Sequence, residues 1–355
     1  MQNLDSLIEI SKLDAGQVLG SIEYLPEQIK EIATELKYLA FPKSFSNVNN
    51  IVVCGMGGSA LGGRIVHSLF MESLKIPVEV VTSYRLPNYV NKDSLVFLSS
   101  YSGNTEETIM GAHDAISRKA QIVGIATGGK LVDILEKVNA PCLLIRPKSN
   151  PSGQPRMGLG YSIMAILGIL SKSKLINLSE SQIEGIIATT EKYVDLYGVR
   201  SEERKNVAKM LSKKILGKVV NLVVSEHLAG SAHAFKNQLN ENAKVFSNLF
   251  EISELNHHLM EGLRFPNKNR EISTFLFIES KNYFERIKKR YSLTEEVIKK
   301  NGFGYEVYKT QSTTKLEEVF EILVLGSYIS FYLSMLEGIN PSPIPWVDYF
   351  KEKLS

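Results

Sequence analysis

Two short segments of the sequence contain the residue types that hold a phosphate group. The first, residues 55–63, reads GMGGSALGG. Glycines allow positive φ and a close approach of the backbone to a ligand, and a helix that begins there presents free N–H groups to an anion. The second, residues 99–108, reads SSYSGNTEET. Its hydroxyl groups can hydrogen-bond several oxygens of one phosphate without a full cation.

Each segment also has a simpler explanation. Gly55, Gly57 and Ala60 fit the spacing G-x-G-x-x-A of a dinucleotide fingerprint. That fingerprint expects an acidic residue after the second strand to hold the ribose, but residues 78–83 read VEVVTS and end without one. The hydroxyls of the second segment could simply cap a helix. Two such loops at successive strand ends favour a ligand site, because ligands of parallel sheets bind outside the carboxyl ends of the strands.

The surrounding sequence alternates between short apolar runs and runs of helical length. Runs of strand type occur at 51–54, 78–81, 95–98, 122–126 and 142–145, and again at 219–224, 273–278 and 305–308. Short strands that are apolar throughout and alternate with helices indicate a parallel sheet covered on both faces. The uncharged stretch 157–171 predicts a buried helix, and a long apolar helix is expected at 316–338.

The predicted fold class is therefore α/β, with two doubly wound parallel-sheet domains in tandem and helical N-terminal, connecting and C-terminal segments. We assign residues 1–155 to an N-terminal helix and the first domain, which ends at the Pro/Gly-rich break PSGQPR. Residues 156–213 form a helical connector. Residues 214–355 form the second domain with its C-terminal helices.

Composition narrows the class of protein. The chain of 355 residues has a net charge of only +3, which argues against nucleic-acid binding as its main activity. The uncharged run 322–336 is shorter than the roughly 20 residues that a membrane span needs, and the first residues show no signal-peptide pattern. Cys54 and Cys142 lie in apolar runs, without disulfide or metal spacing. We expect a cytoplasmic protein without membrane or nucleic-acid partners.

The combination of GMGGSALGG with SYSGNTEET resembles the sugar isomerase (SIS) domain, whose Ser/Thr loop holds the phosphate of a phosphosugar. In the second half, residues 238–242 (QLNEN) and 254–257 (ELNH) resemble the bifunctional phosphoglucose/phosphomannose isomerases, which consist of two SIS domains. The resemblance covers nearly the full chain. It implies an isomerase that interconverts glucose 6-phosphate, and mannose 6-phosphate, with fructose 6-phosphate through an enediolate, with no cofactor and no metal.

The resemblance also assigns roles to individual residues. The substrate phosphate would be bound by Gly57, Gly58, Ser59, Ser100, Ser102 and Thr105. Glu241 would be the base that moves a proton between C1 and C2. His257 would help to open the sugar ring, Arg156 would steady the developing negative charge, and Lys351 matches a C-terminal lysine that reaches the site.

The chemistry asks for the same residue types independently. Proton abstraction beside a carbonyl needs a carboxylate or histidine of tuned pKa, the enediolate oxygen needs a cation or donor, and ring opening suits histidine. Without the resemblance, Glu241 could be a helix-end carboxylate, Arg156 a structural ion-pair partner and Lys351 a solvated terminal lysine. His257 and His258 are adjacent, so on a regular element only one of them can face a site.

Two segments depart from the family pattern. The chain reads Asn256-His257-His258 where the family often has Asn-His-Asn, and residues 340–343 read NPSP where the family has Asp-Pro-Thr-Pro. A threonine hydroxyl in that segment is implied to help accept the stereochemistry of mannose, so the relative activity on the two sugars stays open. Related enzymes are dimers, which implies a homodimer in which His257 is donated to the partner's site.

Other functions remain to be weighed. A non-catalytic sugar-phosphate regulator of SIS type would normally carry a DNA-binding motif, and residues 1–45 show no basic recognition-helix pattern. An aminosugar synthase would need an N-terminal catalytic cysteine, but no cysteine precedes Cys54. A heptose phosphate isomerase is normally a single SIS unit. The isomerase is therefore our first hypothesis, and the regulator is the alternative.

Overall fold

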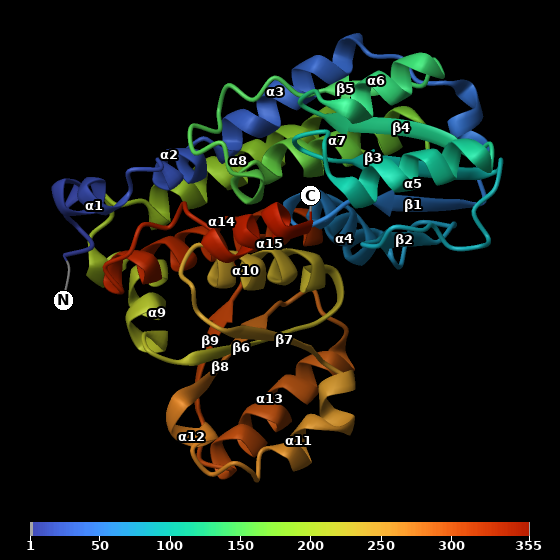
Figure 1. Ribbon diagram of the computed structural model, residues 1–355. Coiled ribbons are helices and arrows are strands. Elements are labelled where there is room, and N and C mark those ends of the chain that lie inside the picture. Colours follow the sequence, from blue (N-terminus) through green and yellow to red (C-terminus); the bar gives the residue numbers. More distant parts are fainter. Residues whose placement is uncertain (1–2, 355) are drawn as a thin grey trace.

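The computed structural model describes residues 3–354, and two parallel sheets form within them (Figure 1). The first sheet has the order β2-β1-β3-β4-β5, with β1 (Asn50–Cys54), β2 (Val78–Val81), β3 (Ser94–Ser99), β4 (Gln121–Ala126) and β5 (Cys142–Leu144). The second has the order β7-β6-β8-β9, with β6 (Val219–Val224), β7 (Ser247–Glu251), β8 (Ser273–Glu279) and β9 (Gly304–Lys309). The predicted α/β class with two parallel-sheet domains is confirmed.

Helices cover both faces of the first sheet because its strands are apolar on both sides. In β1, Ile51 and Val53 belong to the main core, whereas Val52 and Cys54 belong to a second core on the other face. The main core is covered by α3 (Leu25–Tyr38), α4 (Gly58–Phe70) and α7 (Leu159–Lys172). The second core is covered by α5 (Glu106–Ser117) and α6 (Lys130–Lys137).

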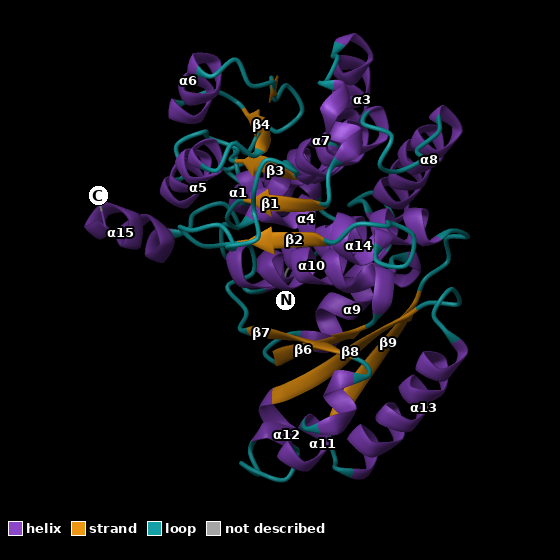
Figure 2. Cartoon of the chain, turned by 90° about the vertical axis from the view of Figure 1, so that its right-hand side faces the viewer, coloured by secondary structure: helices purple, strands orange, loops and turns teal. Residues whose placement is uncertain are grey.

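The second sheet is layered in the same way (Figure 2). The face toward the first domain carries α9 (Val207–Ile215), α10 (Ala229–Glu241) and α14 (Lys315–Leu336). The far face carries α11 (Leu259–Gly262), α12 (Asn269–Ile272) and α13 (Glu285–Lys300). The remaining α-helices are α1 (Leu7–Leu13), α2 (Val18–Glu23), α8 (Glu180–Tyr197) and α15 (Pro345–Leu354).

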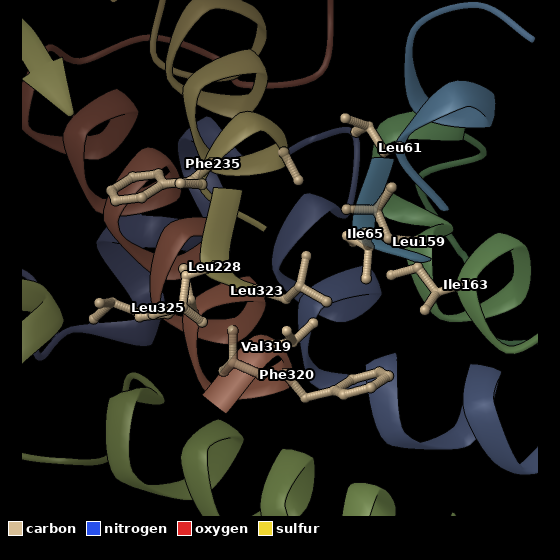
Figure 3. Packing of buried hydrophobic residues seen from close by; sticks show 14 of the residues in the cluster. Leu61, Ile65, Leu159, Ile163, Leu228, Phe235, Val319, Phe320, Leu323 and Leu325 are labelled. Carbon is tan, nitrogen blue, oxygen red and sulfur yellow. The ribbon is translucent and has the colours of Figure 1, made fainter. Parts of the chain in front are cut away.

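One hydrophobic core joins the two domains where α4, α7, α10 and α14 meet (Figure 3). Two glycines allow this close approach. A Cβ on Gly230 would lie 2.5 Å from the Cα of Ile65, and a Cβ on Gly326 would lie 2.6 Å from the Cβ of Phe235. At Gly230 the backbone of α10 therefore packs on the backbone of α4, and at Gly326 the backbone of α14 packs on the Phe235 side chain, which holds the two sheets together.

Helix α14 is long and apolar enough to cross a membrane by length and composition, and it is the one such helix within residues 3–354. Its most apolar window is 94% buried inside the fold, as in the core helix of a globular protein. The stretch predicted as a buried helix at 157–171 is also confirmed, since Leu159–Leu170 of α7 are all buried. Neither β7 nor α13 was among the predicted elements. The β7 sequence SNLFE has only two apolar residues, and only Ser247 of the strand is buried, so no apolar run marks it.

Candidate functional site

The two predicted phosphate-binding segments lie side by side at the point where the first sheet changes direction. Strands β1 and β3 are neighbours, and from them the chain continues outward to β2 on one side and to β4 on the other. Connections that diverge in this way open a crevice at the carboxyl ends of the strands. The Ser99 hydroxyl donates to the Ser59 carbonyl at 2.8 Å, and the Tyr101 N–H donates to the Ser59 hydroxyl at 2.9 Å.

The hydroxyl groups of these segments are arranged to donate. Ser59 and Ser102 each accept a backbone N–H, from Tyr101 and Asn104, and neither donates to an acceptor within residues 3–354. The Ser100 hydroxyl donates to Thr105 Oγ1 at 2.9 Å, which leaves the Thr105 hydrogen free in turn. Three O–H groups can thus be turned toward an oxyanion, beside the N-termini of α4 and α5.

The loop shapes depend on glycine at two positions. Gly57, with φ of +50°, turns the chain into α4, and Gly103 has φ of +68°. A Cβ on Gly103 would lie only 1.6 Å from the Gly128 carbonyl oxygen, so no other residue fits there. The Ser/Thr loop is therefore held against the loop that follows β4.

Arg156 links the glycine loop and the Ser/Thr loop of the first domain to the second domain. Its backbone nitrogen would lie 3.0 Å from a Cβ on Gly58, so the start of α4 packs directly on it. Its side chain is 2% exposed, and this burial lowers the pKa of the guanidinium, opposed by Glu241 and Asp348. The guanidinium nevertheless stays charged, because the ordinary pKa of arginine lies above 12.

The guanidinium of Arg156 is almost fully used by the protein. Its Nε donates to Asn242 Oδ1 at 2.6 Å, and its Nη1 donates to Gln154 Oε1 at 2.8 Å. Its Nη2 donates to the carbonyls of Pro341 and Ser342 at 3.0 and 2.7 Å. Since a guanidinium has five N–H groups, one N–H on Nη1 is left for another oxygen.

Glu241 lies beside that remaining donor. It is the last residue of α10, and its Oε2 is 3.7 Å from Arg156 Nη1. Burial raises the pKa of the Glu241 carboxyl, while the positive charges of Arg156, Lys244, Lys351 and Lys236 oppose the rise. Its side chain is 29% exposed, so a ligand can reach it. A reachable carboxylate with a raised pKa, beside a fixed cation, is suited to moving protons.

The C-terminal segment brings two further candidates to the same place. Ser342 accepts the Arg156 bond through its carbonyl, and its hydroxyl lies 3.4 Å from Gln154 Nε2. Helix α15 follows and is exposed along its length. Its Lys351 makes no hydrogen bond to Glu241 but is near enough for its charge to lower the pKa of that carboxyl. Ser342 and Lys351 thus lie beside the site and make no hydrogen bond to the Glu241 carboxylate.

His257 does not join this cluster within one chain. The Ser247 hydroxyl donates to Asn240 Oδ1 at 2.8 Å, so β7 begins beside the last turn of α10, where Glu241 lies. His257 ends the 3₁₀ turn Glu254–His257, which follows the opposite end of β7. A five-residue strand spans ~13 Å between its first and last residues. His257 is exposed, and Asn256 anchors the turn by donating to Thr294 Oγ1 on α13.

The equivalent crevice of the second sheet, between β6 and β8, is filled by its own side chains. Glu318 of α14 is fully buried there and receives bonds from His227 at 2.6 Å, Ser280 at 2.7 Å and Thr310 at 2.5 Å. A buried carboxylate repels an anion. Among the described residues, this point of the second sheet therefore offers no set of hydroxyl donors like that of Ser59, Ser102 and Thr105. A separate cavity of about 430 Å³ lies beside Ser225 and Arg64, and none of the candidate residues lines it.

The sequence did not reveal the residues that hold Arg156 and Glu241 in place. Asn242, Gln154 and Lys244 were not among the candidates, although Asn242 and Lys244 lie within three residues of Glu241. A lysine just after a helix C-terminus is a known signal for capping the last carbonyls. The contact of Arg156 with Pro341 and Ser342 joins residues far apart in sequence, and no local pattern announces it.

Comparison with known proteins is consistent with this geometry. Residues 44–134 match the SIS domain model, and residues 204–354 match the model of the bacterial phospho-glucose isomerase C-terminal SIS domain. The chain is similar in fold to a hypothetical protein of Thermus thermophilus, with a TM-score of 0.73 and 14% identity, over 95% of this chain and 90% of that one.

Two relatives carry the same name. The bifunctional phosphoglucose/phosphomannose isomerase of Caldicellulosiruptor bescii is 33% identical, over 94% of this chain and 98% of the relative. The protein of that name from Thermoplasma volcanium is 30% identical, over 92% of this chain and 99% of the relative. At this identity and coverage, the chain belongs to the bifunctional phosphoglucose/phosphomannose isomerase family.

Proposed function

We propose that this chain interconverts glucose 6-phosphate and mannose 6-phosphate with fructose 6-phosphate. The observation that carries the proposal is the pairing of Glu241 with Arg156 at 3.7 Å, next to the glycine and Ser/Thr loops whose free hydroxyl groups would bind the phosphate. Aldose–ketose isomerisation moves one proton between two carbons and oxidises one carbon of the substrate while reducing its neighbour. It therefore needs a base and a stabiliser of negative charge, which these two side chains supply.

The phosphate would be held by the first domain. The free O–H groups of Ser59, Ser102 and Thr105 and the amides at the starts of α4 and α5 would donate to its oxygens, with Ser100 orienting Thr105. Gly57 and Gly58 let the backbone approach. This leaves the other end of the sugar free to extend along Arg156 toward Glu241, because Arg156 touches the glycine loop at its backbone and Glu241 at its side chain.

Proton transfer would then take place between Glu241 and the C1–C2 bond. The carboxylate removes the proton from C2 of the aldose, the C–H electrons form the C1=C2 bond of an enediolate, and the carbonyl oxygen takes the negative charge. The fifth N–H of Arg156 would bind that oxygen. The O2 hydroxyl then passes its proton to O1, the electrons left on O2 form the C2=O bond, and Glu241 returns its proton to C1, which completes the ketose. Lys351 would add positive charge from α15.

Ring opening would require the second subunit of a dimer. His257 lies at the far end of β7 from Glu241, so in this proposal it serves the active site of the partner in a homodimer. The reaction is the one that connects aldose and ketose phosphates in glycolysis and gluconeogenesis, and a cytoplasmic location is part of the proposal. Ser342, beside Gln154 and Arg156, would tune the acceptance of the mannose configuration at C2.

The test is a coupled assay of fructose 6-phosphate formation from each sugar phosphate, for the parent chain and Glu241→Gln. Gln keeps the shape of the side chain but cannot take the proton. We expect kcat to fall by about 10³-fold or more with glucose 6-phosphate still bound, because the phosphate is held elsewhere. Binding is measured by calorimetry.

Glu136→Gln, an exposed change on α6, is the matched control and should leave both measurements unchanged. Parent turnover of glucose 6-phosphate alone would restrict the proposal to that sugar and point to Ser342. No parent turnover, with sugar phosphate still bound, would overturn the isomerase in favour of a sugar-phosphate regulator.

A further inference from the structure

Lys244 joins the helix that ends in Glu241 to the C-terminal segment. Its ammonium donates to the Glu241 carbonyl at 2.7 Å and to the Asn242 carbonyl at 3.4 Å, the unpaired acceptors at the end of α10. It also donates to the Pro341 carbonyl at 3.0 Å. Pro341 O is the same atom that accepts a bond from Arg156, so the two cations hold one carbonyl between them.

The geometry limits what this ammonium can do. A lysine ammonium has three N–H groups, and three carbonyl oxygens of the chain receive them. No donor remains for a substrate oxygen, in contrast to Arg156 with its one spare N–H. Lys244 also has φ of +57°, a left-handed conformation that brings the chain sharply out of α10.

We propose that Lys244 is a positioning residue, which fixes the Glu241 carboxylate relative to the 341–342 segment and thereby relative to the spare N–H of Arg156. This inference rests on the proposed function. A displacement of about 1 Å in a catalytic group can cost about 10²-fold in rate. Substrate phosphate binding, in contrast, depends on loops that Lys244 does not touch.

The bonds of the Lys244 ammonium to the carbonyls of Glu241, Asn242 and Pro341 form a clamp, and this clamp should depend on pH. Burial of the ammonium lowers the pKa of Lys244 to about 8, the guanidinium of Arg156 adds to the fall, and Glu241 opposes it. As pH rises through about 8, the ammonium loses a proton and therefore a donor. One of the three carbonyls, those of Glu241, Asn242 and Pro341, then loses its bond from Lys244, and kcat falls.

The decisive variants are Lys244→Met, which keeps the stem without donors, and Lys244→Arg, which stays charged at every pH of the assay. We expect Lys244→Met to lower kcat by 10- to 100-fold with KM changed by less than about threefold. Lys244→Arg should recover most of that loss and remove the fall in kcat near pH 8. Lys236→Met is the matched control, because Lys236 lies on α10 with Glu241 and its charge also lowers the pKa of Glu241, but it makes no bond to the 341–342 segment.

The proposal is overturned if Lys244→Met loses no more kcat than Lys236→Met, or if Lys244→Arg shows the parent's alkaline fall. A readout that does not use catalysis separates this from failure of the proposed function. Trp346, the one tryptophan of the sequence, lies 81% exposed on α15 just beyond the clamped segment. Its fluorescence anisotropy should fall in Lys244→Met, and unchanged anisotropy at an unchanged melting temperature would contradict the clamp.

Discussion

The residue that most constrains the candidate site is Arg156. A buried cation is costly unless it is hydrogen-bonded and paired, and here four bonds and one carboxylate compensate it. Its acceptors come from three different parts of the chain, near residues 154, 242 and 341. The fixed position of its last donor is therefore the result of tertiary structure and is ready before a substrate binds, as electrostatic stabilisation requires.

Replacing Arg156 with Lys should separate the effect of its positive charge on kcat from the effect of its hydrogen-bond geometry. The shorter side chain keeps the positive charge but offers at most three donors and withdraws from Glu241. Because the N–H group beside Glu241 is lost, we expect kcat of Arg156→Lys to fall by about 10²- to 10³-fold. In the proposed mechanism Glu241 acts as a base when it is ionised, so kcat/KM should fall as pH decreases through its raised pKa. With the opposing cation farther away, this acidic fall should move to higher pH. The measurement is kcat/KM for glucose 6-phosphate across pH 4–9.

The control is Arg204→Lys, the same change at a site that is 76% exposed, where the pair with Glu202 contributes little. It should leave both the rate and the pH profile unchanged. An Arg156→Lys enzyme with the parent's acidic fall would show that Arg156 does not set the charge environment of the base.

At the scale of elements, the site depends on how closely α4 approaches the turn that carries Arg156. A Cβ on Gly58 would lie 2.9 Å from the carbonyl carbon and oxygen of Pro155. These are backbone atoms, so they can move only if the whole turn moves. Gly58→Ala should therefore shift Arg156 away from Glu241, lowering kcat by about 10- to 100-fold, and destabilise the fold by about 1–3 kcal/mol. Steady-state kinetics and denaturant unfolding measure the two effects.

Gly262→Ala provides the comparison, because a Cβ at that position on α11 meets no atom within 4 Å among the described residues. It should change neither property by a measurable amount. If Gly58→Ala kept the parental kcat while losing stability, the close packing would serve the fold and not the position of Arg156.

The elements of the first domain could be predicted because their signals are local. Apolar runs located β1 and β3, and the glycine and Ser/Thr segments after them were correctly expected at the carboxyl ends of the strands. What could not be predicted is that β1 and β3 are neighbours across the change of direction, since pairing is not local. The placement of Pro341 and Ser342 on Arg156 was likewise out of reach, because residues nearly 190 positions apart meet there.

At the scale of the whole molecule, the two domains contribute different kinds of residue to the candidate site. The carboxyl ends of β1 and β3 carry hydroxyl groups that are free to donate, whereas the buried carboxylate of Glu318 lies at the equivalent point of the second sheet. The second domain instead supplies Glu241 from the end of α10, which the shared core fixes against α4. Glu241 is therefore held by the junction of the domains, and His257 is carried to the opposite end of β7.

This separation leads to a complementation experiment. In the proposed homodimer, the Glu241→Gln and His257→Gln variants should each be nearly inactive, because every site lacks one group. In a mixed dimer, one site lacks both groups and the other has an intact Glu241 from one subunit and an intact His257 from its partner. Random exchange of equal amounts makes about half of the dimers mixed, so the mixture should regain roughly a quarter of the parental activity.

The recovered activity should require subunit exchange, and mixing each variant with itself gives the baseline. If His257 acted within its own chain, both sites of a mixed dimer would lack one group, and the mixture would stay inactive. Sedimentation of the parent as a fully active monomer would contradict the arrangement in the same way. The opposite placement of Glu241 and His257 along β7 favours recovery, because the fold brings His257 to an exposed surface turn that a second subunit can reach.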